Sequence, residues 1–280
     1  MRHTIGGRGK AVIHAAAPWA ACVLFAALAG ALSGCATSPS ASSVPATDII
    51  TASDESEARK RARIRTELAV NYFEQGQITV ALDEIKQALV ADPTYADAFN
   101  LRGLIFMRLS DPRQAEESFR RAVALNPRDA DTLHNLGWFL CEQRRFADAQ
   151  RHFEQALASP LYPGRAKTLM TLGLCQARAG QRAEAERSLA RSYELDAGNP
   201  ITGFNLAKLL FERGEKVRAQ FYIRRLNNGE FANAESLWLG VKVERAMEDR
   251  TAMEQLGEQL ARRFPQSREF ASYQRGAFDE

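Results

Sequence analysis

Small and large apolar residues recur along most of this chain at an interval of about 34 positions. A small residue recurs near the start of each unit, at Ala69, Gly103, Gly137, Gly173, Ala207 and Gly240. A second small residue follows twelve positions later, and a large apolar residue comes four positions after that, as at Ala81 and Ile85. Such self-similarity at a fixed interval is the sequence signature of a repeat protein.

Each unit predicts two amphipathic helices joined by a short turn. A glycine often marks the turn, as at Gly76, Gly180 and Gly214. The small residues let the two helices approach closely, and the large apolar residue fills the groove between them. Proline cannot continue a helix, so Pro93 and Pro127 close the first two units. Because one hairpin cannot bury its own apolar face, the units must stack.

This pattern resembles the tetratricopeptide repeat family over about residues 62–265. The resemblance implies an all-α fold, a right-handed superhelix of six tetratricopeptide repeats that are antiparallel helix hairpins. The repeats are expected to start near residues 62, 96, 130, 166, 200 and 233. Two extra residues lie within the segment 159–165, where they lengthen the connection after the third repeat. A plain helical bundle is the alternative, but it would not keep a fixed interval.

The first 34 residues predict a lipoprotein signal peptide. Arg2, Arg8 and Lys10 form a positively charged start, and an alanine-rich apolar stretch follows. The stretch ends in Leu-Ser-Gly-Cys at residues 32–35, a layout typical of a secretory signal. The ending resembles a bacterial lipobox, which implies that Cys35 becomes the first residue and is acylated. The alternative is an uncleaved membrane helix, since the stretch is nearly long enough to span a bilayer.

The residue after the anchor cysteine indicates which membrane is used. In the lipoproteins that this ending resembles, an aspartate there favours retention at the inner membrane, and this chain has Ala36 instead. The resemblance therefore implies lipid anchoring at the periplasmic face of the outer membrane. Residues 35–53 are rich in Ser, Ala, Thr and Pro and predict a flexible tether. The repeat domain is expected to occupy residues 54–280.

Charge argues against a nucleic-acid-binding protein. Three of the 37 basic residues lie in the first 34 residues, which hold no acid, and the remaining 34 face 34 acidic residues. A nucleic-acid-binding protein usually carries a basic excess on its folded part. We therefore expect no nucleic-acid partner.

The chain offers little for catalysis. It contains no HExxH, Walker or GxSxG motif. His134 and Cys141 lie on one predicted helix, but seven positions correspond to about 10 Å, too far for a hydrogen bond between base and nucleophile. We therefore expect no enzymatic activity, no cofactor and no metal site.

By the geometry of the repeat family, the first helix of each repeat lines a groove. Ten residues are expected to line a partner-binding groove: Phe73, Asn100, Leu104, Met107, His134, Trp138, Leu174, Phe204, Lys208 and Phe211. This surface is apolar and aromatic, and Trp and Met are enriched at protein interfaces. We expect an apolar or amphipathic segment of a partner to lie there, centred on Trp138. The alternative is that some of these side chains pack between neighbouring repeats.

Two cysteines occupy nearby positions in the first helices of repeats three and four. These helices are neighbours in a stack, so we expect Cys141 and Cys175 to meet across the seam between the repeats. An exported protein is in an oxidising compartment, which permits a disulfide. Closing a loop of this length contributes about 3–4 kcal/mol in the chain-entropy account. The alternative is two independent buried thiols.

Three segments distinguish the chain from a generic repeat protein: Asn135–Cys141, Ala158–Pro163 and Leu172–Cys175. With them, the chain resembles the type IV pilus biogenesis and stability proteins known as PilW or PilF. The resemblance implies a pilotin that binds a secretin subunit and promotes localisation and multimerisation of the secretin ring, and we expect the protein to be a monomer. The alternative is a generic envelope scaffold or adaptor lipoprotein for another outer-membrane assembly machine.

Overall fold

The computed structural model describes residues 54–278, and within them it contains thirteen helices and no strand. In chain order these are α1 (Glu57–Glu74), α2 (Ile78–Ala91), α3 (Ala96–Arg108), α4 (Pro112–Leu125), α5 (Ala130–Glu142), α6 (Phe146–Leu157), α7 (Arg165–Arg178), α8 (Arg182–Leu195), α9 (Pro200–Glu212), α10 (Lys216–Asn227), α11 (Ala234–Ala246), α12 (Arg250–Arg263) and α13 (Arg268–Arg275). The expected signal peptide, tether and anchor Cys35 lie outside the described residues.

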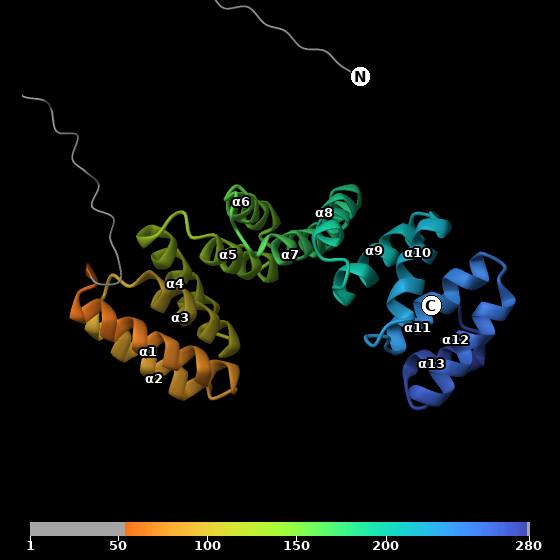
Figure 1. Ribbon diagram of the computed structural model, residues 1–280, viewed down its shortest axis with the longest axis horizontal. Helices are drawn as coiled ribbons and strands as arrows, with labels where there is room; N and C mark the ends of the chain where they lie inside the picture. Colours follow the sequence, from red (N-terminus) through yellow and green to blue (C-terminus); the bar gives the residue numbers. More distant parts are fainter. Residues whose placement is uncertain (1–53, 279–280) are drawn as a thin grey trace, which may run out of the picture. The chain divides into compact units, whose positions relative to one another are not determined.

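Helices α1 to α12 pair into six consecutive antiparallel hairpins, α1 with α2 through α11 with α12 (Figure 1). The all-α repeat fold predicted from the sequence is therefore confirmed. Helix α1 begins at Glu57, five residues before the expected start of the first repeat. The reason is a cap: the side chain of Ser56 accepts a hydrogen bond of 3.1 Å from the backbone N–H of Arg59.

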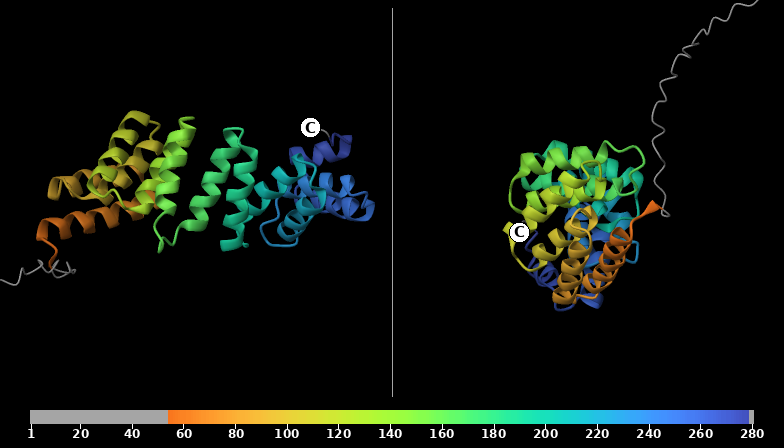
Figure 2. Two further views of the ribbon diagram at one scale, coloured as in Figure 1. Left: turned by 90° about the horizontal axis from the view of Figure 1, so that it is seen from above. Right: turned by 90° about the vertical axis from the view of Figure 1, so that its left-hand side faces the viewer.

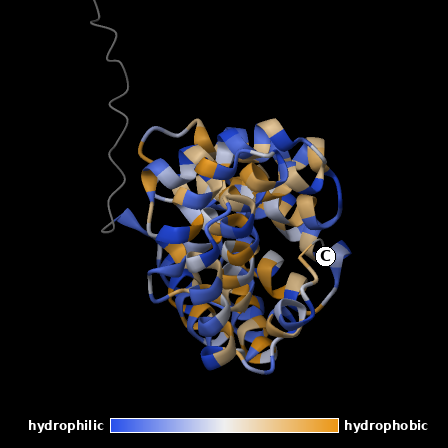
Figure 3. Cartoon of the chain, turned by 90° about the vertical axis from the view of Figure 1, so that its right-hand side faces the viewer, coloured by the Kyte–Doolittle hydropathy of each residue, from blue (hydrophilic) through white to orange (hydrophobic). Residues whose placement is uncertain are grey.

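The small residues of the pattern lie where the two helices of a hairpin cross. A Cβ atom on Gly103 would lie 2.5 Å from the ring of Phe119, and one on Gly137 would lie 2.9 Å from the ring of Phe153. Both rings are fully buried. A side chain at either glycine would force the helices apart, so the spacing of small and large residues is a packing requirement. Figure 3 shows the resulting alternation of hydrophobic and hydrophilic residues along the helices.

The odd-numbered helices line the inner side of the array. Each contacts the next odd-numbered helix, from α1 with α3 to α11 with α13, whereas the even-numbered helices contact only the helices next to them in the chain. Elements that touch their counterparts in the next repeat lie on the shorter side of a curved stack. Figure 1 accordingly shows α6 and α8 outside α5 and α7. We call the odd-numbered helices the inner helices.

The repeat pattern does not predict α13, which follows the sixth repeat. It packs against α11 and α12, and the ring of Tyr273 covers Gly257 so closely that a Cβ there would lie 2.1 Å from the ring. Beyond α13, Phe278 stacks on Trp238 with ring centroids 5.5 Å apart. The segment therefore covers apolar surface that the last hairpin would otherwise expose.

Candidate protein-binding groove

The residues expected to line a groove all lie on inner helices, but they differ in exposure. Seven of them are partly exposed: Phe73, Asn100, Leu104, Met107, Leu174, Phe204 and Phe211. Most of these side chains also pack against buried core residues, so they form the floor between adjacent inner helices. Asn100 belongs to the same surface and accepts a hydrogen bond of 3.0 Å from the side chain of Asn135.

Trp138 stands out on this surface. Its side chain is 39% exposed, whereas the other aromatic side chains on the inner helices of the described part are partly or fully buried. A large aromatic side chain that is left in water in the free protein is typical of an interface anchor. The structure therefore leaves Trp138 accessible to a partner.

His134 does not line the groove, and that prediction is wrong. Its side chain is 3% exposed because it faces the seam between α5 and α7. Its Nδ1 lies 2.9 Å from Oγ1 of Thr168, which donates to the hydroxyl of Tyr162, which in turn donates to Asp131. If Nδ1 of His134 carries the proton, then His134, Thr168 and Tyr162 each donate one hydrogen bond to the next side chain.

Burial keeps this histidine neutral. Desolvation, with a smaller contribution from the charge of Lys167, lowers the pKa of His134 to about 4. Desolvation also raises the pKa of Tyr162 to about 12. The seam between repeats three and four is therefore held by a hydrogen-bond chain that runs from a neutral imidazole to the side chain of Asp131.

The same seam contains the two cysteines of the repeat domain. The Cα atoms of Cys141 and Cys175 lie 5.9 Å apart, and their sulfur atoms are at bonding distance. Both side chains are 3% exposed. This Cα separation lies within the range that a disulfide spans. A disulfide between repeats three and four stays a prediction that chemical analysis can test.

A cavity of about 690 Å³ opens on the inner side of the carboxyl-terminal repeats. Its walls come from three inner helices: Phe204, Lys208, Phe211 and Glu212 from α9; Glu235, Trp238, Leu239 and Lys242 from α11; and Arg268, Glu269 and Ser272 from α13, with Phe278 beyond it. Three of the residues predicted from the sequence, Phe204, Lys208 and Phe211, are thus brought together in one place. We call this space the carboxyl cavity.

The carboxyl cavity combines aromatic walls with charges of both signs. Lys208 and Lys242 are close enough for the charge of Lys208, after desolvation, to lower the pKa of Lys242. The ammonium of Lys242 lies 5.5 Å from the centre of the Trp238 ring. Such a surface suits an amphipathic segment, with apolar side chains against the rings and an acidic group near the lysines.

Sequence reasoning did not find Trp238, Lys242 or α13. Trp238 and Lys242 are four positions apart on α11 and therefore share one face. That spacing was a usable signal. The part of the carboxyl cavity that α13 forms had no such signal in the sequence, because a single helix after the last hairpin does not repeat the pattern.

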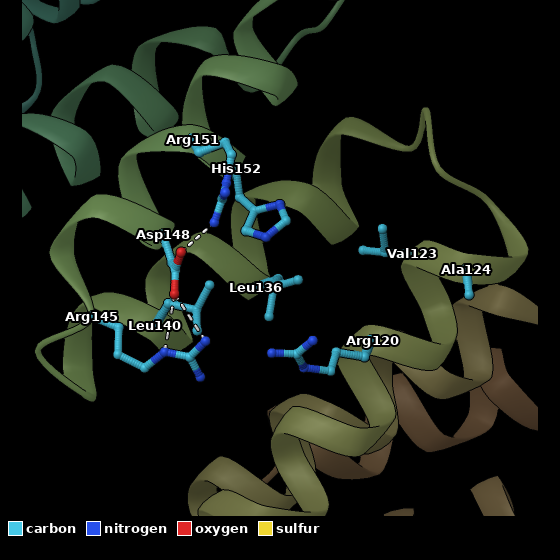
Figure 4. A pocket seen from close by; sticks show the side chains of 9 residues that line it. All are labelled: Arg120, Val123, Ala124, Leu136, Leu140, Arg145, Asp148, Arg151 and His152. Atoms are coloured by element: carbon cyan, nitrogen blue, oxygen red, sulfur yellow. Dashed lines mark hydrogen bonds and ion pairs between the residues drawn. The ribbon is translucent and has the colours of Figure 1, made fainter.

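A second depression lies on the outer side, between α4 and α6 (Figure 4). It measures about 440 Å³, with Leu136 and Leu140 of α5 at its floor. The arginines at its rim are engaged with acids of the same surface. Arg145 bonds Asp148 at 2.9 Å and Glu116 at 2.6 Å. Since these charges are satisfied, the outer depression is a weaker candidate than the inner surface.

Two more features concern residues 54–278 alone. No helix among them is both long and apolar enough to cross a bilayer. No group of three or more His, Cys, Asp or Glu side chains there is arranged to hold a metal ion.

Known proteins resemble the chain in sequence and in structure. Family models of the tetratricopeptide repeat match residues 66–130 and 118–151. The type IV pilus assembly protein PilF of Pseudomonas aeruginosa is 32% identical over 208 residues, which are 74% of this chain and 82% of PilF.

Two solved structures extend this similarity. A structure of Pseudomonas aeruginosa PilF gives a TM-score of 0.72 at 30% identity, covering 79% of this chain and 100% of that one. The crystal structure of PilW, a widely conserved type IV pilus biogenesis factor, gives a TM-score of 0.69 at 32% identity, covering 76% and 97%.

Proposed function

This chain belongs to the family of the type IV pilus assembly protein PilF, and we propose that it is a pilotin, a lipid-anchored protein that promotes assembly of a secretin ring. The family supports a protein-interaction role in pilus biogenesis. The finer proposal adds the partner, a secretin subunit, and the place, the periplasmic face of the outer membrane. It needs no catalysis, cofactor or metal.

The observation that carries the proposal is the inner surface that runs from Trp138 to the carboxyl cavity. It presents an exposed indole, two phenylalanine rings and a pair of lysines on a scaffold of stacked helices. An apolar or amphipathic segment of the secretin fits this chemistry. Lipid anchoring through Cys35 would keep that segment near the bilayer, since tethering raises effective concentration.

Assembly of the secretin in cells tests the proposal. We expect a Cys35 replacement to reduce the amount of heat-stable secretin multimer in the outer membrane, because the protein no longer concentrates subunits there. The amount of the lipoprotein itself, measured in the same cells, controls for its expression. Normal multimers in normal location would rule out the anchoring role.

The partner requires a separate measurement. A photo-crosslinking amino acid in place of Trp138 should capture the secretin subunit in cells, and the same group at the outer position Phe221, which is 58% exposed, should not. Capture of a different envelope protein at position 138 would favour the alternative, a generic envelope scaffold or adaptor. That outcome would leave the groove assignment in place and change the partner.

A further inference from the structure

The connection between α6 and α7 holds one apolar side chain out into solvent. Leu161 is 93% exposed and stands between Pro160 and Tyr162-Pro163, in the segment that carries two residues more than the repeat interval requires. Single exposed leucines are ordinary on protein surfaces. What distinguishes this one is how firmly its neighbours are fixed.

Side chains on both sides pin the connection. Tyr162 is 5% exposed and donates a hydrogen bond of 3.1 Å to the carboxylate of Asp131 on α5. The guanidinium of Arg165 donates to the backbone carbonyls of Leu157 and Ser159 at 2.7 and 3.0 Å. The two prolines restrict the backbone further. The exposed leucine is therefore presented on a fixed turn.

This turn lies on an identifiable edge of the array. Every inner helix begins at the same edge, because each follows an outer helix of the preceding repeat, and residues 54–56 lead into α1 there as well. Both views of Figure 2 show the later connections on the side where α1 begins. We call this the loop edge: residues 54–56, 92–95, 126–129, 158–164, 196–199 and 228–233, together with the helix ends beside them. The opposite, turn edge contains residues 109–111, 143–145 and 213–215.

Other exposed apolar side chains mark the loop edge. Val90 at the end of α2 is 85% exposed, Leu195 at the end of α8 is 57% exposed, and Phe231 before α11 is 54% exposed. Ile201 at the start of α9 adds a fifth at 49%, whereas the turn edge has three, with Val80 at 39%, Leu109 at 42% and Val217 at 69%. Among the large apolar side chains of residues 54–278, the two most exposed, Leu161 and Val90, both belong to the loop edge.

We propose that the loop edge rests on the lipid bilayer, with Leu161 inserted at its surface. The occupant follows from where the described residues begin: residue 54 lies at this edge, and the proposed anchor, Cys35, precedes it by 19 positions in the sequence. Apolar side chains spread over several connections suit an extended surface better than a single peptide. The inference rests on the proposed lipid anchoring for its setting in the cell, and it deepens that function by orienting the groove.

Hydrogen exchange on vesicles tests the inference. The chain from Cys35 onward is coupled through the Cys35 thiol to a maleimide lipid in vesicles of phosphatidylethanolamine and phosphatidylglycerol. Chemical coupling holds the protein at the bilayer whether or not cells acylate Cys35, so failure of the anchor proposal is measured separately. On vesicles, we expect amides in 158–165 and 228–233 to exchange about tenfold more slowly than in the uncoupled protein, as local burial slows exchange.

The turn edge supplies the control. Amides in 109–111 and 213–215 should exchange equally in the coupled and uncoupled protein. Leu161→Asp should abolish the protection of 158–165, whereas the matched variant Leu109→Asp should not. Circular dichroism should be unchanged in both, since both side chains are exposed. Equal exchange at the loop edge on and off vesicles, or protection that requires added secretin subunit, would overturn the inference.

Discussion

The middle of the repeat array and its carboxyl-terminal end join their inner helices in different ways. In the middle, α5 and α7 meet through the two cysteines, whose Cα atoms are 5.9 Å apart, and through the hydrogen-bond chain from His134. At the end, α9, α11 and α13 surround a cavity of about 690 Å³. The ion pair of Arg224 with the buried Glu244, at 2.6 Å, braces α10 against α11 there.

This difference separates two tasks. The middle fixes the position of each repeat relative to the next, and it presents Trp138 and Leu161 on a defined frame. The end leaves room between inner helices for side chains of a partner. A repeat protein transmits such local differences because each repeat contacts only its neighbours. Four predictions test whether the middle and the end depend on the features named.

The largest effect is expected at the carboxyl-terminal end. Arg224→Ala leaves the carboxylate of Glu244, which is 1% exposed, without its charged partner. Removing one member of a buried ion pair costs about 3–5 kcal/mol of unfolding free energy, because the remaining charge is left buried without compensation. Urea denaturation followed by circular dichroism measures the loss.

A matched variant separates the cost of leaving a buried charge without its partner from the cost of removing an arginine in general. Arg120→Ala breaks an exposed pair with Glu116 and should cost under about 1 kcal/mol. The double variant Arg224→Met with Glu244→Met should regain most of the stability, since it removes the buried charge. Equal losses for Arg224→Ala and Arg120→Ala would show that the end does not depend on this pair.

The next effect is expected in the middle. Replacing Cys141 and Cys175 with serine should lower the free energy of unfolding by about 3–4 kcal/mol, because a loop of this length gains entropy when it is not closed. Reductant should destabilise the natural protein and leave the double variant unchanged. Two free thiols in the denatured, unreduced protein would show that the middle is not cross-linked.

The sequence predicted best those features that repeat, and it missed several that depend on a single repeat. The close approach of Gly103 to Phe119 recurs in other repeats, so its spacing was readable along the chain. The environment of His134 depends on Thr168 in the next repeat and on Tyr162 in the lengthened connection, which no interval reveals. The repeat pattern therefore places His134 at a position that usually faces the groove, whereas in the structure its side chain is buried between α5 and α7.

The stability of the middle of the array should also depend on pH, through His134. Burial lowers the pKa of His134 from 6.5 to about 4, so the unfolded state takes up the proton first as pH falls. The stability that the neutral ring contributes is complete above about pH 6.5 and is lost as pH falls through 4, by about 3 kcal/mol in total.

Comparing the pH dependence of stability between variants separates the contribution of His134 from that of the carboxylates. Between pH 7 and 4, His134→Gln should lose less stability than the natural protein. Burial also lowers the pKa of His152 at the outer depression, so His152→Gln should depart from the natural protein in the same direction but by less, because His152 is only partly buried. Parallel pH profiles for the natural protein and His134→Gln would contradict the assigned role.

The smallest change in free energy, and the most direct test of the central claim, is the affinity of the purified protein for a secretin subunit. Trp138→Ala should weaken binding about tenfold or more, as loss of an aromatic anchor does, and Lys208→Glu should weaken it too. Phe221→Ala, on the outer helix α10, should leave the affinity unchanged. Unchanged affinity for Trp138→Ala and Lys208→Glu, with a loss for Phe221→Ala, would place the binding surface outside the groove.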